Sequence, residues 1–158
     1  MGNVRRKSLE GTPCPIARSL DVIGDWWSLL IVRDAFLGRR RFGEFQKSLG
    51  LSKNILTQRL RALVGDEILE LVPASDGSAY QEYVLAPKGR DLYPVIVALR
   101  QWGTDHCFDA EPCGTVLVER ATGKPVRKLA VQAADGRTLD ARETMLVPRA
   151  GKDLSIMI

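Results

Sequence analysis

The chain has 158 residues, of which 45% are hydrophobic and 27% charged, a composition typical of a folded protein with a hydrophobic core. The net charge of +4 favours a polyanionic partner, but many proteins that bind no nucleic acid share it. The sequence shows no run of about 18 apolar residues and no apolar leader, so we expect neither a membrane protein nor a secreted one. Its three scattered cysteines do not form a disulfide framework. We expect a cytoplasmic protein with reduced thiols.

Three helices are predicted in the first fifty residues. A short helix should run from Pro15 to Val22 because its apolar residues have helical spacing. A second helix, from Trp26 to Phe36, is apolar on most sides and should form the centre of the core. The third follows the arginine run at residues 39–41 and stops at Gly50.

A fourth helix begins almost at once. Only Leu51 separates Gly50 from Ser52, which is a good N-cap for a helix that reaches Asp66. Two helices joined by such a tight turn are the signature of a helix-turn-helix.

Two β-like runs, 68–72 and 80–85, flank turn-forming residues and predict a hairpin, or wing. From Pro87 to about Phe108 we expect one long helix, whose apolar stripe is broad enough to contact both its own core and a second subunit. The residues expected at this dimer interface are Leu92, Val95, Ile96, Leu99 and Trp102.

Beyond residue 111 the pattern predicts three short strands, 115–120, 126–133 and 138–147, in a β-meander too small to bury a core of its own. The expected fold class is α+β, mainly α: a winged helix-turn-helix with a long C-terminal dimerisation helix and a small C-terminal β-meander. The expected divisions are a basic tail at 1–12, a DNA-binding and dimerisation domain at 13–108, and a β-rich extension at 109–158.

The helix from Ser52 to Asp66 has two opposite faces. Leu56, Leu60 and Leu63 share the inward one. The outward face carries side chains that suit base edges in a major groove. The predicted base-reading residues are Asn54, Thr57, Gln58 and Arg61.

Residues around this helix could neutralise DNA phosphates and give binding a steep salt dependence. The predicted phosphate contacts are Arg39, Arg40, Arg41, Lys47, Ser52, Lys53 and Arg59. Arg59 lies between the two faces, and the alternative for it is an ion pair with Asp66 or Glu67. The alternative for the whole outward face is an ordinary solvated helix surface, which the tight turn, the wing and the arginine run make less attractive.

Five motifs in order resemble the HxlR family of winged helix-turn-helix regulators, within the MarR-like superfamily. They are Cys14-Pro15-Ile16, residues 23–34 (IGDWWSLLIVRD), Arg41-Phe42-Gly43-Glu44-Phe45, Leu56-Thr57-Gln58-Arg59-Leu60, and the stretch from Glu82-Tyr83 to Trp102-Gly103. The resemblance covers about Pro13 to His106. It implies a homodimer formed through the terminal helices, which binds pseudo-palindromic operators in double-stranded DNA.

The wing departs from the family pattern. No Lys or Arg occurs from Asp66 to Pro87, whereas family wings usually carry a basic residue before the Glu-Tyr pair. We therefore expect phosphate binding to depend on the arginine run, Lys47 and Lys53.

The resemblance also makes Cys14 a candidate redox switch, since some relatives sense oxidants through this cysteine. The alternative is a small buried residue that helps to pack the dimer. His106, Cys107 and Cys113 supply three ligands at irregular spacing where structural zinc takes four. We therefore expect no metal and no cofactor. A reactive pair of Cys107 and Cys113 is no better supported than the zinc site.

An enzyme is not expected, because the chain has one histidine and lacks a phosphate loop and a nucleophile elbow. We expect a sequence-specific transcriptional regulator, acting as a repressor. Two alternatives remain: a sensor gated by a small-molecule effector between the helical core and the β-meander, and a winged helix that binds a protein.

Overall fold

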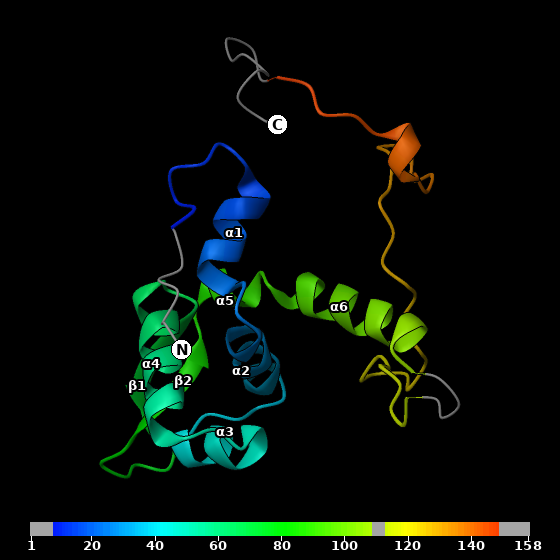
Figure 1. Ribbon diagram of the computed structural model, residues 1–158. Helices are drawn as coiled ribbons and strands as arrows, with labels where there is room; N and C mark the ends of the chain where they lie inside the picture. Colours follow the sequence, from blue (N-terminus) through cyan, green and yellow to red (C-terminus); the bar gives the residue numbers. More distant parts are fainter. Residues whose placement is uncertain (1–7, 109–112, 149–158) are drawn as a thin grey trace. The chain divides into compact units, whose positions relative to one another are not determined.

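The computed structural model describes residues 8–108 and 113–148. These residues form two compact units whose boundary falls between Tyr93 and Pro94, so each unit is described by itself. Figure 1 shows the elements in order: α1 (Pro15–Ile23), α2 (Trp26–Phe36), α3 (Phe42–Leu49), α4 (Lys53–Gly65), β1 (Leu69–Pro73), β2 (Gln81–Leu85), α5 (Pro87–Arg90), α6 (Tyr93–His106) and the short 3-10 helix η1 (Ala141–Glu143). The fold is mainly helical with a small two-stranded antiparallel sheet.

The core of the first unit gathers around α2, as expected. This helix starts at Asp25, whose carboxylate accepts hydrogen bonds from the N–H groups of Trp27 and Ser28 at 3.0 and 3.1 Å. It contacts α1, α3, α4 and β2. The side chains that meet there are almost completely buried: Ile31, Val32, Phe45, Leu56, Leu60, Leu63, Ile68 and Leu69.

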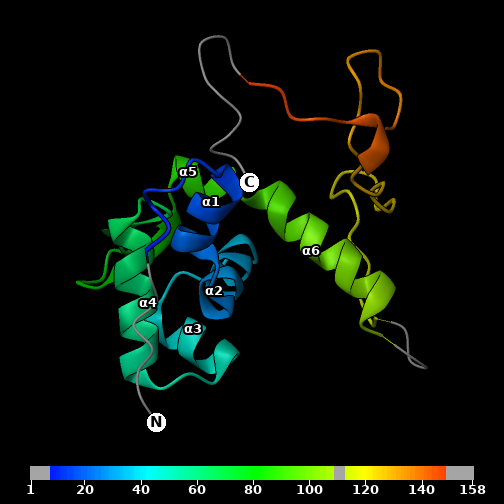
Figure 2. The same cartoon turned by 45° about the horizontal axis from the view of Figure 1, so that its top comes forward.

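The helix-turn-helix and the wing lie within a residue or two of their predicted bounds. α3 ends at Gly50, which has a φ of 65°, and the Oγ atom of Ser52 caps α4 by accepting from the N–H of Ile55 at 3.4 Å. The wing pairs β1 with β2 in the register Leu69 with Leu85 and Pro73 with Gln81. In both views α4 stands beside this hairpin (Figures 1 and 2).

The predicted long helix from Pro87 is divided. α5 ends at Arg90, and α6 begins at Tyr93 after a turn. Pro94 explains the division, because the ring of a proline inside a helix clashes with the carbonyl of the residue four positions earlier, here Arg90, and donates no N–H.

The second unit contains most of α6 and the C-terminal segment. The predicted turns are present: the N–H of Gly123 donates to the carbonyl of Glu119 at 2.8 Å, and that of Gly136 to Ala133 at 2.9 Å. In the described part of this segment, however, the expected strands are reduced to two isolated bridges, Val118 with Pro125 and Gln132 with Thr138. Nearly all of its side chains are exposed, and hairpins without a packed face are marginal in water.

Candidate nucleic-acid interface

The outward face of α4 is open. Asn54, Gln58 and Arg61 are exposed and Thr57 is half-buried, while Leu56, Leu60 and Leu63 on the opposite face are buried to 1% exposure or less. Within the described residues, none of the four outward side chains makes a hydrogen bond or an ion pair with the protein itself. Their donors and acceptors are therefore available to a ligand.

Of the seven predicted phosphate contacts, Ser52 caps α4 through its hydroxyl, and the six cations fall into two groups. Lys47 on α3 and Lys53 at the start of α4 are exposed and form no ion pair within the described part of the chain. Arg39, Arg40, Arg41 and Arg59 are all ion-paired with carboxylates of the protein.

Arg39 and Arg59 are held by acids of the helical core. The Nη1 atom of Arg39 lies 3.3 Å from Oδ1 of Asp34, a fully buried carboxylate that also accepts from Arg33 at 2.8 Å. Arg59 pairs with Asp25 at 3.4 Å and not with Asp66 or Glu67, the partners that the sequence suggested. Asp25 therefore both caps α2 and connects it to α4.

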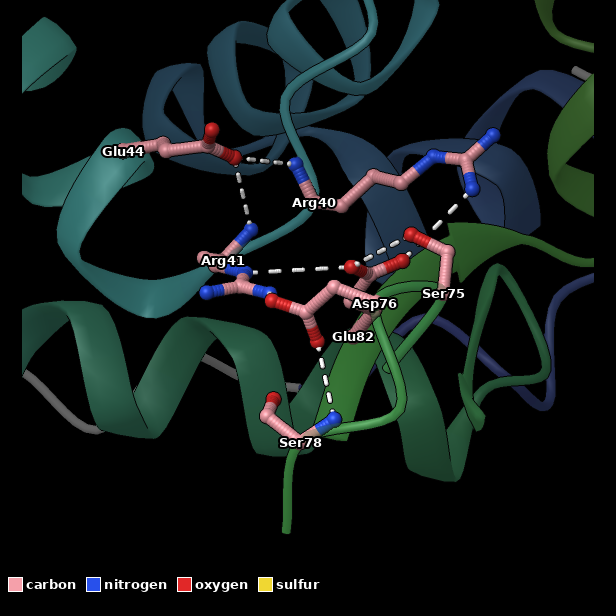
Figure 3. Close-up of polar contacts among 7 residues, drawn as sticks. All are labelled: Arg40, Arg41, Glu44, Ser75, Asp76, Ser78 and Glu82. Carbon is pink, nitrogen blue, oxygen red and sulfur yellow. Dashed lines mark hydrogen bonds and ion pairs between the residues drawn. The ribbon is translucent and has the colours of Figure 1, made fainter. Parts of the chain in front are cut away.

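Arg40 and Arg41 join the start of α3 to the wing (Figure 3). Nη1 of Arg40 lies 3.5 Å and Nε of Arg41 3.7 Å from the carboxylate of Glu82, which is 3% exposed. Glu82 also accepts from the hydroxyl of Ser75 at 3.0 Å. The backbone adds a further contact, because the N–H of Tyr83 donates to the carbonyl of Arg40 at 2.8 Å.

At the tip of the wing, Asp76 forms an ion pair with the guanidinium of Arg41. The pKa of Asp76 is held well below its usual range by the hydroxyl and the backbone N–H of Ser78 and by Arg41. The pKa of Arg41 is raised by the same contact with Asp76. Both groups are therefore charged at neutral pH.

Glu44 orders the entry to α3. Its carboxylate accepts hydrogen bonds from the N–H groups of Arg40 and Arg41, at 2.8 and 2.9 Å, and these bonds lower its pKa. This is the acceptor half of a capping box, which fixes the arginine run in place.

The acidic partners Asp34, Asp76 and Glu82 were missed by sequence reasoning. Asp76 is 35 residues from Arg41 in the sequence, so the contact depends on how the wing folds back. The sequence did contain one indication of these contacts. The predicted wing has carboxylates and no Lys or Arg, so it could form ion pairs with the arginine run.

Elsewhere, Val95, Leu99 and Trp102 of the predicted dimer interface are 41%, 49% and 61% exposed, whereas Leu92 and Ile96 are half-buried. Cys14 is half-buried at the N-cap of α1. The described residues contain no cluster of metal ligands. No helix among them is long and apolar enough to cross a membrane.

Comparison with known proteins identifies this arrangement. Residues 22–111 match the model of the HxlR-like helix-turn-helix family. The chain belongs to this family. The HTH-type transcriptional regulator Rv3095 of Mycobacterium tuberculosis is 43% identical over 136 residues, which are 86% of each chain.

Solved structures agree. The crystal structure of PA1607 has a TM-score of 0.85 and 55% identity, and the match covers 90% of this chain and 100% of that one. The redox regulator HypR in its oxidized form matches 61% of this chain and 100% of its own, with a TM-score of 0.55 and 31% identity. The chain is thus a transcriptional regulator with a helix-turn-helix DNA-binding fold.

Proposed function

We propose that this member of the HxlR-like family is a repressor that binds a pseudo-palindromic operator as a homodimer, with α4 in the major groove. The observation that carries the proposal is the open outward face of α4, where Asn54, Gln58 and Arg61 have no internal partner among the described residues. Amide and guanidinium groups at this spacing suit adenine and guanine edges. Lys47 and Lys53 supply phosphate contacts beside them.

The dimer is proposed from the apolar stripe of α6 and from α1. Val95, Leu99 and Trp102 are largely exposed on α6, and Ile16 on α1 is 70% exposed. Large apolar side chains left exposed on a helix mark a candidate interaction surface, and each of the two helices carries them. In helix-turn-helix dimers the two recognition helices bind half-sites about one helical turn of DNA apart, and we propose the same spacing for the two copies of α4.

The test separates base reading from phosphate binding. With a selected DNA duplex, Arg61→Ala should relax base preference, at a cost of about 1–3 kcal/mol at one position, whereas Lys53→Ala should weaken binding to all sequences and make the salt slope shallower by about 1. Ala62→Ser on the same helix is the matched control, since Ala62 is exposed and the change alters no charge. A binding affinity that does not change with salt concentration would overturn the proposal and favour a protein partner.

Redox control through Cys14 is a second proposal, favoured by the similarity to the redox regulator HypR. Cys14 is half-buried and immediately precedes the first turn of α1. Oxidation should change operator affinity in the wild type and not in Cys14→Ser. An equal response of the two proteins would exclude this cysteine as the switch. A small-molecule effector stays a prediction of the sequence.

A further inference from the structure

The wing of this chain is acidic where it faces the arginine run. Residues 67–86 contain four carboxylates and no Lys or Arg. Two of these carboxylates, those of Asp76 and Glu82, contact Arg41. The hairpin therefore brings negative charge to the part of the fold that would meet a DNA backbone.

The two carboxylates differ in a way that decides their roles. Glu82 is 3% exposed, accepts from Ser75, and neighbours both Arg40 and Arg41, so it holds the wing to the core. The side chain of Asp76 is 52% exposed at the tip of the turn. Because the side chain of Arg41 is also 40% exposed, this ion pair lies at the surface.

Arg41 is placed where a phosphate could reach it. Its side chain is 40% exposed and lines an open groove between α3 and the wing, together with Glu44, Lys47, Tyr80 and Gln81. The Glu44 carboxylate is engaged by the backbone N–H groups of Arg40 and Arg41. Lys47 has no partner among the described residues. A DNA phosphate held by Lys47 in this groove would have the guanidinium of Arg41 on the same lining.

A carboxylate and a phosphate bind a guanidinium through the same charge-assisted hydrogen bonds. We propose that Asp76 is an affinity-determining residue that competes with a DNA phosphate for Arg41 and so lowers the affinity of the protein for DNA of every sequence. This inference rests on the proposed DNA binding. In this proposal the wing has the opposite effect from a basic wing. It weakens binding to the DNA backbone, so that α4 supplies most of the affinity for the operator.

The test is Asp76→Asn. Asparagine keeps the Oδ1 acceptor that receives the N–H of Ser78 at 3.0 Å, so the turn is preserved while the charge is removed. Binding to a selected duplex and to a random duplex is measured by fluorescence anisotropy over a range of salt concentrations. We expect affinity for both duplexes to rise by the same factor, roughly two- to fivefold at low salt, and the salt slope to steepen by about 1.

Two further proteins isolate the mechanism. Glu70→Gln removes the same charge from an exposed residue of the same hairpin that forms no ion pair within the described residues, and it should change affinity much less. In an Arg41→Ala background, Asp76→Asn should bring no gain, because the cation it releases is absent. Melting temperatures check that all variants fold.

The outcomes distinguish the two claims. If the wild type binds DNA with a steep salt dependence but Asp76→Asn matches Glu70→Gln, or its gain persists without Arg41, the competition is refuted and the proposed function stands. If the wild type shows no salt-dependent DNA binding, the proposed function itself fails.

Discussion

Arg39 has one role predicted from the sequence, a phosphate contact, and another in the structure, an ion pair with Asp34. Sequence position places it among the phosphate contacts, and the structure places its guanidinium 3.3 Å from the fully buried carboxylate of Asp34. A buried carboxylate that loses a cation is costly, although here Arg33 stays on the same oxygen at 2.8 Å.

Arg39→Ala should therefore lower the free energy of unfolding by about 1–3 kcal/mol, measured by urea denaturation. Arg39→Lys, which keeps the charge, should recover part of the loss. A variant with unchanged stability and weakened DNA binding would show instead that Arg39 serves only the DNA backbone.

Residue roles were predictable from the sequence only where they follow from position within one element. The outward placement of Asn54, Gln58 and Arg61 follows from helical spacing, which is local. The ion pairs of Arg40 and Arg41 with the wing are not local, since they require the hairpin to fold back on the start of α3. No property of the arginine run by itself separates a DNA contact from a structural one.

At the scale of elements, helix positions depend on capping hydrogen bonds and on close backbone packing. The pKa of Glu44 is lowered by the N–H groups of Arg40 and Arg41, so its ionised form stabilises the start of α3. A lowered folded-state pKa means that this contribution is present above the unfolded pKa of about 4.3 and is lost as the pH falls through the folded value.

Glu44→Ala should accordingly destabilise the protein by about 0.5–2 kcal/mol at pH 7. The difference from the wild type should narrow as the pH falls below the unfolded pKa of about 4.3 and through the lowered folded pKa, because the wild-type carboxylate then loses its charge. Denaturant unfolding at pH 7 and at a series of acidic pH values measures it. A difference that does not change with pH would show that the charge of Glu44 does not hold the cap.

Gly89 fixes α5 against the wing. A Cβ atom at this position would lie 2.1 Å from the carbonyl oxygen of Ile68 and 3.2 Å from Cδ2 of Leu85, so Gly89→Ala must move backbone. We expect a loss of about 1–3 kcal/mol in unfolding free energy. Gly65→Ala, where nothing lies within 4 Å, should be neutral or stabilising. Equal melting temperatures for the two variants would contradict this packing.

The elements themselves were largely predictable from the sequence, since α2 and α4 combine a capping residue with clear apolar periodicity. Two expectations were not met, for different reasons. The break before α6 had a local signal in Pro94. The strands beyond residue 113 had favourable turns, but the apolar side chains of the described segment stay exposed, and a hairpin without a packed face is marginal in water.

For the whole molecule, the proposed dimer depends on the exposed stripe of α6. Leu99→Glu places a charge in that stripe, where Leu99 is 49% exposed, and should convert the dimer to a monomer in light scattering at micromolar concentration. Ala62→Glu adds the same charge on an exposed position of α4 and should leave the mass unchanged. A wild type that is already monomeric would refute the interface.

The most direct test of the central claim is selection of bound DNA from a random pool by the wild-type protein. Two copies of α4 related by a two-fold axis predict an enriched, pseudo-palindromic sequence with half-sites about 10 base pairs apart, and Arg61→Ala should blur one position in each half. A pool that shows no enriched sequence, or enriched sites without two-fold symmetry, would contradict base reading by a dimer of this chain.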